Sequence, residues 1–355
     1  MRIVVAMSGG VDSSVAAALL AEEGHDVIGV SMQLYDQSGG ESFGRCCSLE
    51  DLHDARRVAA AINIPHYILN YERQFDEHVV SNFVREYARG RTPIPCAHCN
   101  SDLKFATLVE HARGFGAEAV ATGHYARVAA DPVTGRYLLK RGADASKDQA
   151  YFLFSLTQDQ LGRAIFPVGD RIKNGVREYA RARRLPVADK PDSQEICFVP
   201  DQDYASFVER HAPSVEQPGA IVDEQGHVLG RHEGLHRFTI GQRKGLGLSS
   251  SPTGKPLYVL ALQPREHVVV VGPKESLSRA TLEASDVNWV IDEPSAPLRI
   301  QAQIRHRHVP ADATVQALPG RRAEVVFDQP QIAVTPGQAV VFYIGDVVAG
   351  GGWID

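Results

Sequence analysis

RIVVAM at residues 2–7, followed directly by SGGVDSSV at residues 8–15, is the stretch that decides the fold of this chain. The apolar first part predicts a buried strand, and the alanine-rich residues 15–23, ended by Gly24, predict a helix. A glycine pair between the two lets the backbone turn tightly and approach a ligand closely. Because backbone N–H groups and hydroxyls at the start of a helix favour an anion, we expect a pyrophosphate to bind at this turn.

This turn differs from the two most familiar phosphate-binding signatures. It lacks the Gly-Lys-Ser/Thr of a P-loop, and it lacks the Gly-x-Gly-x-x-Gly of a dinucleotide fold. It resembles the SGGxDS signature of the ATP pyrophosphatases, which bind ATP and cleave it between the α and β phosphates. A turn that only caps a helix is the alternative, since Asp12 and Ser13 are good N-cap residues. The complete signature at a strand-to-helix junction favours nucleotide binding.

Length and composition indicate a globular protein of several domains. At about 100 to 200 residues per domain, 355 residues allow two or three of them. The 44% hydrophobic and 23% charged content is typical of soluble proteins, and no apolar run approaches the ~20 residues that span a bilayer. The sequence opens on a strand rather than a cleavable leader, so we expect a cytoplasmic protein that binds no membrane. Five cysteines, an odd number, favour thiol or metal chemistry over structural disulfides.

The pattern of elements changes along the chain. Apolar strands expected at residues 2–7, 27–32, 66–70 and 117–122 alternate with helices, which predicts an α/β fold with a parallel sheet. A capping box beginning at Ser48 opens one of these helices. Hairpins with a turn at residues 132–135 follow, then helical periodicity over residues 158–184. After about residue 205 the helices end and short strands separated by Gly and Pro predict small barrels or sandwiches, with residues 273–276 as a linker.

The net charge of −6 does not indicate a nucleic-acid-binding protein, because it gives no overall attraction to phosphates. Binding depends on local patches, however, and each basic cluster is either such a patch or an ordinary solvated surface. The clusters are Arg177, Arg181, Arg183 and Arg184, and then Arg305, His306, Arg307 and His308.

Two distant segments carry cysteines in polar surroundings. Cys96 and Cys99 lie in a proline-containing stretch that predicts a rigid loop, and Cys197 lies in DSQEICF at residues 192–198. A thiol reacts as the thiolate, which requires an exposed or electropositive setting, and rigid loops provide it. Two unconnected buried cysteines are the alternative. The neighbouring nucleotide motif favours a shared site.

The sequence as a whole resembles the bacterial tRNA-specific 2-thiouridylases. The motifs that carry the resemblance occur in family order from residue 8 to residue 343: SGGVDSS, RTPIPCAHCN, ATGHYARV, KDQAYFL, DSQEICFVP, FTIGQRKGLG and PGQAVVFY. The family replaces the C2 oxygen of the wobble uridine with sulfur. The resemblance implies an ATP pyrophosphatase catalytic domain over residues 1–205, a small central domain over 206–273 and a C-terminal β-barrel that contacts tRNA over 274–355.

The resemblance also implies the roles of individual residues. Cys197 would carry the persulfide and Cys99 would be the partner nucleophile, the two pairing as a transient disulfide. The ATP-binding residues would be Ala6, Met7, Ser8, Gly9, Gly10, Val11, Asp12, Ser13, Met32 and Gly123. The tRNA-contacting residues would be His124, Lys147, Asp148, Gln149 and Gln338, of which His124 and Gln338 would flank the target uridine. Magnesium would offset the phosphate charge near Asp12, and a protein would donate the persulfide sulfur.

One segment departs from the family pattern. Where the family has Asn-Pro-Asp before the first catalytic cysteine, this chain has Ile94-Pro95-Cys96, so two groups that approach the target base are missing. Cys96 also creates a C-x-x-C, and Cys46 and Cys47 add two more thiols. An iron–sulfur or zinc tRNA-binding protein is therefore an alternative. Another ATP pyrophosphatase that thiolates tRNA is a second one. Whether sulfur reaches C2 directly from the persulfide or as released sulfide stays open at this stage.

Overall fold

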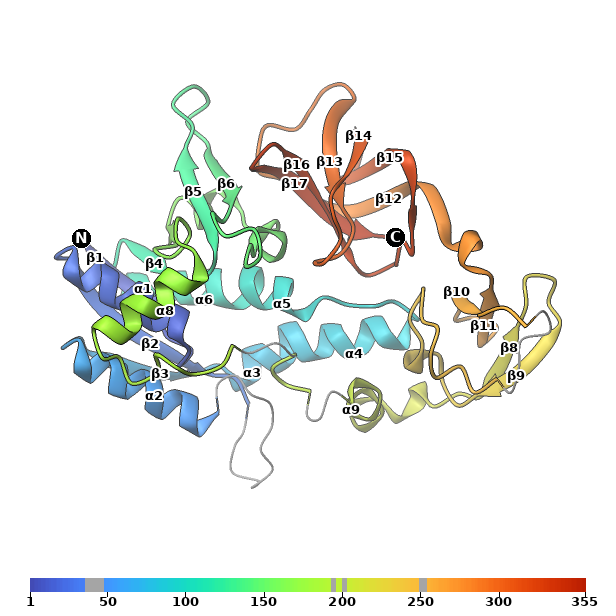
Figure 1. Cartoon of the computed structure of the whole chain (residues 1–355), viewed down its shortest axis with the longest axis horizontal. Coiled ribbons are helices and arrows are strands. Elements are labelled where there is room, and N and C mark those ends of the chain that lie inside the picture. The colour runs from blue at the N-terminus through green and yellow to red at the C-terminus, as the bar shows by residue number, and fades with distance from the viewer. Residues whose placement is uncertain (36–47, 193–195, 200–202, 249–253) are drawn as a thin grey trace. The chain divides into compact units, whose positions relative to one another are not determined.

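The computed structural model describes residues 1–35, 48–192, 196–199, 203–248 and 254–355, and the chain divides into two compact units (Figure 1). Residues 1–80, 95–202 and 345–350 form the first unit, and residues 81–94, 203–344 and 351–355 form the second. Cys46 and Cys47 lie outside the described residues.

A five-stranded parallel sheet is the centre of the first unit. Its strand order is β3-β2-β1-β4-β7, and every neighbouring pair is parallel. The strands are β1 (Arg2–Ala6), β2 (Asp26–Gln33), β3 (His66–Asn70), β4 (Ala119–Ala121) and β7 (Ala164–Ile165). The chain runs from β1 outward to β3 and then returns to place β4 on the other side of β1. Such a reversal opens a crevice at the carboxyl ends of β1 and β4, where open parallel sheets bind ligands.

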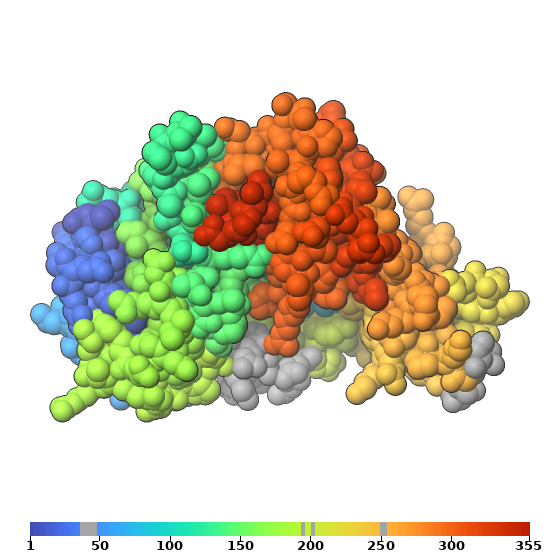
Figure 2. All heavy atoms as spheres, turned by 45° about the horizontal axis from the view of Figure 1, so that its top comes forward, coloured from blue at the N-terminus to red at the C-terminus, as the bar shows by residue number. Residues whose placement is uncertain are grey.

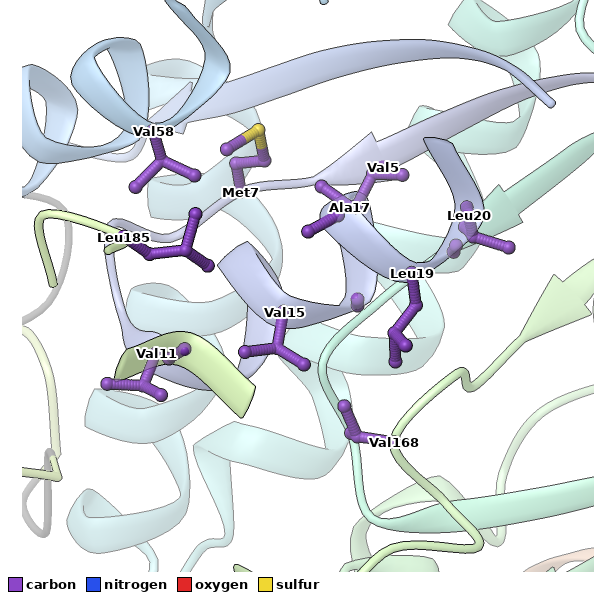
Figure 3. Packing of buried hydrophobic residues seen from close by; sticks show 14 of the residues in the cluster. Val5, Met7, Val11, Val15, Ala17, Leu19, Leu20, Val58, Val168 and Leu185 are labelled. Carbon is purple, nitrogen blue, oxygen red and sulfur yellow. The ribbon is translucent and has the colours of Figure 1, made fainter. Parts of the chain in front are cut away.

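Alternate residues of β1 point to opposite faces of the sheet, and each face is covered by helices. Ile3 and Val5 pack with α1 (Val11–Glu22), α2 (Leu49–Ala61) and α8 (Lys173–Ala182) in one buried cluster. Figure 3 shows Val15 and Leu19 of α1 within this cluster. Val4 packs on the other side with α6 (Thr107–Gly114). The sheet is therefore buried on both faces, which explains why its strands are continuous apolar runs.

The remaining elements of the first unit are short. A hairpin of β5 and β6 turns at residues 132–135, as predicted, and Val347 pairs with Lys140 of β6. The elements are α3 (Glu72–Phe75), the π-helical turn η1 (Asp76–Val80), α5 (Pro95–His98), the π-helical turn η2 (Cys99–Phe105), β5 (Ala126–Ala130), β6 (Tyr137–Arg141), the 3₁₀ turn η3 (Ala150–Leu153) and α7 (Gln158–Leu161).

The second unit contains a four-stranded sheet and, apart from residues 347–350 of its last strand, a closed barrel. The sheet has the order β10-β11-β8-β9, and the barrel has six strands in the order β12-β15-β14-β13-β16-β17, closed by pairing of β12 with β17. Strands β12–β17 are coloured orange to red in Figures 1 and 2. The helical elements are α4 (Ser81–Ala88), α9 (Tyr204–His211), η5 (Pro213–Val215), η6 (Leu235–Arg237) and η7 (Lys274–Leu277). The strands are β8 (Gly219–Val222), β9 (Val228–His232), β10 (Tyr258–Gln263), β11 (Val268–Gly272), β12 (Ser278–Trp289), β13 (Leu298–Gln303), β14 (Ala311–Leu318), β15 (Arg322–Ile332), β16 (Ala339–Ile344) and β17 (Val347–Ile354).

Three sequence predictions need correction. The helical pattern expected over residues 158–184 is two helices, α7 and α8, with β7 between them. The expectation that helices end at about residue 205 is wrong for α9, which runs from Tyr204 to His211. The predicted loop around Cys96 and Cys99 is helical, because α5 and η2 follow each other without a break. Among the described residues we find no helix with both the length and the apolar character needed to span a bilayer.

Candidate active site

The loop between β1 and α1 has the geometry of an anion-binding turn. Gly9 has φ +74, and a Cβ there would lie 2.2 Å from the backbone oxygen of Asp51, so only glycine fits. Gly10 is the N-cap of α1 and offers no side-chain cap, which leaves the first-turn N–H groups without a side-chain acceptor at that position. Within the described residues, the N–H groups of residues 10–12 have no hydrogen-bond partner. They are free to bind phosphate oxygens at the positive end of α1.

Serine hydroxyls hold this loop in shape. The Oγ of Ser13 accepts a hydrogen bond from the N–H of Ser8 at 3.2 Å and lies 3.2 Å from the Oγ of Ser8. Ser14 Oγ donates to the carbonyl of Gly10 at 2.8 Å. The hydroxyls therefore close the turn on itself, while the backbone N–H groups stay available for a ligand.

The loop after β4 packs directly on the loop after β1. A Cβ at Gly123 would lie 2.5 Å from the backbone nitrogen of Ser13. Because β1 and β4 are neighbours in the sheet, both loops leave its carboxyl edge together. The structure thus brings Gly123 to the predicted nucleotide loop at the point where the strand order reverses.

Asp12 is held by two groups from elsewhere in the first unit. Lys173 Nζ lies 2.8 and 2.7 Å from the two carboxylate oxygens of Asp12, and the hydroxyl of Tyr125 donates to one of them at 2.8 Å. Lys173 is the first residue of α8 and is only 8% exposed. Burial, followed by the nearby Asp12 carboxylate, raises the pKa of Tyr125, so its hydroxyl keeps its proton as a donor.

Lys173 also binds the segment that leads to Cys197. Its Nζ lies 2.8 Å from Asp192 Oδ1, and Asp192 additionally pairs with Lys147 at 2.8 Å and Arg177 at 2.7 Å. Burial raises the pKa of Asp192, but the hydrogen bonds from Lys147 and Lys173 outweigh it and bring the pKa to about 2. Asp192 is therefore ionised at any physiological pH.

His124 lies immediately after Gly123 and is a neutral imidazole. Burial, and then the charge of Lys104, lowers the pKa of His124 to about 3. Its Nδ1 is 2.7 Å from Thr122 Oγ1, and its ring lies beside those of Phe105 and Phe166, with centroids 6.5 and 6.1 Å away. Because Phe105 and Lys104 belong to η2, the loop after β4 is next to the element that begins with Cys99.

Cys99 and Cys197 lie on segments that border the same short helix. Cys99 is 8% exposed at the first residue of η2, and π-helical turns of this kind are rare and frequently occur at functional sites. Cys197 is half-buried, and the ring of its neighbour Phe198 packs edge-to-face on Phe75 of α3 at 5.4 Å. Since α3 also contacts η2, both cysteine segments are anchored beside α3. Cys96, in contrast, is exposed.

The other predicted site residues have defined partners in the structure. Asp148 accepts hydrogen bonds from the N–H groups of Gly142 and Ala150, at 2.9 and 3.1 Å, and the Oε1 of Gln149 accepts one from the N–H of Tyr125. These side chains stabilise the turn before η3, and the side chain of Lys147 is more exposed than that of Asp148. Met32 is 7% exposed at the end of β2. In the second unit, Gln338 Nε2 donates to the carbonyl of Thr92 at 2.9 Å.

Sequence reasoning missed the network of Tyr125, Lys173 and Asp192 around Asp12. Tyr125 and Asp192 lie inside motifs that were recognised, ATGHYARV and DSQEICFVP, so their positions carried a signal. Lys173 lies outside every recognised motif, and a lysine at the start of a helix is usually an ordinary solvated residue. Only the fold brings it to Asp12, 161 positions away in the chain.

A metal site formed by protein side chains is not visible in the described part of the chain. We find no group of three or more His, Cys, Asp or Glu side chains placed to hold an ion in residues 1–35, 48–192, 196–199, 203–248 and 254–355. Cys46 and Cys47, two of the thiols considered for such a site, lie outside these ranges.

Family models match the chain from end to end. The model described as "tRNA methyl transferase HUP domain" matches residues 1–201. The "tRNA methyl transferase PRC-barrel domain" matches residues 205–273, and the "Aminomethyltransferase beta-barrel domain" matches residues 279–354. Among solved structures, a 4-thiouridine synthetase bound to RNA and ATP is similar with a TM-score of 0.36 and 16% identity, covering 60% of this chain and 50% of that one.

Curated relatives match at high identity over their whole length. The tRNA-specific 2-thiouridylase MnmA of Solibacter usitatus is 54% identical, covering 99% of both chains. The MnmA proteins of Geobacter metallireducens and Clostridioides difficile are 54% and 48% identical, each covering 100% of this chain and 96% and 98% of theirs. This chain belongs to the family of tRNA-specific 2-thiouridylases.

Proposed function

We propose that this chain is an ATP-dependent tRNA 2-thiouridylase. It would adenylate the C2 oxygen of the wobble uridine, and then replace that oxygen with sulfur from a persulfide on Cys197. The observation that carries the proposal is the end-to-end similarity of about half of all residues to proteins of that name. The loop at the switch point and the two cysteine segments beside α3 supply the parts that this chemistry needs.

The first step is activation of the uracil carbonyl. Expelling oxide from C2 is slow, so the oxygen must become a better leaving group, and ATP supplies the adenylyl group that makes it one. The open N–H groups of residues 10–12 and the positive end of α1 fit the departing pyrophosphate. Met32 would border the adenine and Gly123 would close the pocket.

Magnesium would offset the charge of the phosphates in this proposal. Carboxylate oxygens are suitable ligands for it, and Asp12 is the carboxylate of the loop. Both oxygens of Asp12 contact Lys173 in the structure, so binding an ion there would require Asp12 to exchange part of its contact with Lys173.

The second step is sulfur transfer. In the direct route, the terminal sulfur of the Cys197 persulfide attacks C2, and AMP leaves with the former carbonyl oxygen. The Cys99 thiolate then attacks Sγ of Cys197, which releases 2-thiouridine and forms a Cys99–Cys197 disulfide. An external thiol must reduce this disulfide before the next turnover. In the alternative route, Cys99 attacks the persulfide first, and the released sulfide reacts at C2.

The tRNA would bind through its anticodon loop, whose single-stranded bases can be turned out of the stack at low cost. His124, neutral because of its lowered pKa, would face the base as a hydrogen-bonding or stacking group rather than as a cation. Lys147 and Gln338 would be further contacts, and Asp148 and Gln149 would shape the turn that presents Lys147. A persulfide-donating protein would load Cys197, and the reaction would take place in the cytoplasm.

Mass spectrometry of tRNA nucleosides tests this function. The protein is incubated with unmodified tRNA, ATP, magnesium and a persulfide source, and the wobble nucleoside is analysed. We expect sulfur to replace oxygen at C2 only when ATP is present. Because the family models carry the word methyltransferase, a parallel incubation receives S-adenosylmethionine instead. Addition of a methyl group there, with no sulfur incorporation in the first reaction, would contradict the proposal.

An iron–sulfur or zinc protein is the second candidate, and the C-x-x-C of Cys96 and Cys99 is the observation that favours it. Anaerobic purification followed by an absorption spectrum and metal analysis separates the two candidates. A stoichiometric metal whose removal abolishes sulfur transfer would support the cluster. Colourless, metal-free protein that still thiolates tRNA would rule it out.

A further inference from the structure

The segment before Cys197 is attached to both sides of the nucleotide loop. On one side, Lys190 Nζ lies 2.7 Å from Asp51 and 2.6 Å from Asp54, and the backbone of Asp51 is the surface that Gly9 touches. On the other side, Asp192 binds Lys173, which binds Asp12 of the loop. Two residues of one short segment thus contact the supports of the loop at two separate points.

Lys173 is the shared member of the second attachment. Its single Nζ contacts both oxygens of Asp12 and one oxygen of Asp192, all at 2.7 to 2.8 Å. The side chain is nearly buried, so water does not screen these contacts well. Any change in the charge near Asp12 therefore changes how strongly Lys173 holds Asp192.

We propose that Lys173 is a positioning residue that couples nucleotide binding at the 8–13 loop to the position of Cys197. When phosphates, with their counter-ion, enter the loop, Asp12 interacts with them and releases part of its hold on Lys173. Lys173 then binds Asp192, which lies five positions before Cys197, more tightly, and this contact restricts where Cys197 can lie. This inference rests on the proposed function only for the meaning of Cys197 as the sulfur carrier, since the coupling itself requires nucleotide binding alone.

Asp192→Asn is the variant that tests the coupling. It removes the charge that Lys173 holds, keeps the shape of the side chain and leaves the contact between Lys173 and Asp12 in place. The matched control is Asp189→Asn, which breaks the exposed pair of Asp189 with Arg181 of α8. The control removes one acidic charge from the same segment without touching Lys173.

We measure the alkylation rate of Cys197 by peptide mass spectrometry, with and without a non-hydrolysable ATP analogue and magnesium. In the wild type and in Asp189→Asn, we expect the nucleotide to slow alkylation by about fivefold, which is the lower end of the range typical of coupling between two sites. In Asp192→Asn, we expect the nucleotide to bind with similar affinity but to change the rate by less than about twofold. Equal protection in Asp192→Asn and the wild type would overturn the proposal, because it would mean that the nucleotide shields Cys197 directly.

Lys147→Met is the second variant, in case Asp192→Asn unfolds. Lys147 pairs with Asp192 from a side chain that is one-third exposed, so its loss is tolerated more easily. We expect partial loss of the protection by nucleotide, and full protection would count against the proposal. The assay contains no tRNA and no sulfur donor. Wild-type protein that shows the coupling but makes no 2-thiouridine would refute the proposed function and leave this inference standing.

Discussion

Gly123 and Ser13 lie so close that no side chain fits between them. A Cβ at Gly123 would be 2.5 Å from the nitrogen of Ser13 and 2.6 Å from the carbonyl carbon of Asp12. Both atoms belong to the backbone, so a side-chain rotation cannot relieve the contact. The distance therefore fixes how the loop after β4 sits on the start of α1, and it makes Gly123 a sensitive probe of the nucleotide loop.

Gly123→Ala is expected to distort this loop. The added methyl must push the backbone of α1 away, which should cost about 1–3 kcal/mol of stability. The same displacement should weaken ATP binding, because the displaced backbone belongs to the nucleotide loop. The control is Gly114→Ala in α6, where a Cβ meets nothing within 4 Å. That change should be neutral or stabilise by about 0.5 kcal/mol. Titration calorimetry with ATP checks the prediction, and unchanged affinity in Gly123→Ala would contradict it.

Several features of the fold could be predicted from sequence because their signals are local. The strands of residues 2–6, 26–33 and 66–70 coincide with apolar runs, and the Ser48 capping box is present with Asp51 as the returning side chain. The hairpin turn was marked by Pro132 and Gly135. Each of these signals arises within a few residues, so it survives in any tertiary context.

Other features could not be predicted because their cause is tertiary. β7 has two residues, too few to show a period, and exists only because β4 offers it a free edge. The nucleotide loop was recognisable from its glycines, whereas Lys173 becomes a site residue only through the packing of α8 on α1. The helical setting of Cys99 was missed because two nearby prolines favour a loop, yet Pro95 is the first residue of α5, where proline is tolerated.

His124→Gln is expected to change the response of stability to acid. The pKa of His124 in the fold is about 3, below the ordinary 6.5, so between these values the unfolded chain binds a proton that the folded chain does not. Wild-type stability should therefore fall as the pH decreases from about 6.5 toward 3, and the variant should lack this part of the decline. Urea midpoints at several pH values test this, with the exposed His53→Gln as control. Parallel curves for His124→Gln and wild type would contradict it.

Asp192→Asn should remove a contribution to stability that changes over a lower pH range than that of His124. The pKa of Asp192 is lowered to about 2 from the ordinary value of about 3.9. Its contribution is complete above about pH 4 and is lost as the pH falls toward 2. The difference in melting temperature between wild type and variant should thus be largest near neutral pH and shrink below pH 4. Asp189→Asn, in an exposed pair, should show a small difference throughout, and a constant difference for Asp192→Asn would contradict the assignment.

Replacing single cysteines distinguishes a pathway that uses Cys99 and Cys197 alone from a metal site that includes Cys96. Cys197→Ser and Cys99→Ser should each abolish sulfur incorporation while pyrophosphate is still released from ATP in the presence of tRNA, because adenylation precedes sulfur transfer. Cys96→Ser is the matched control, since Cys96 lies three positions before Cys99 but is exposed in α5. If two thiols suffice, Cys96→Ser keeps its activity. Loss of sulfur transfer in all three variants, together with loss of a bound metal, would show instead that Cys96 completes a cluster.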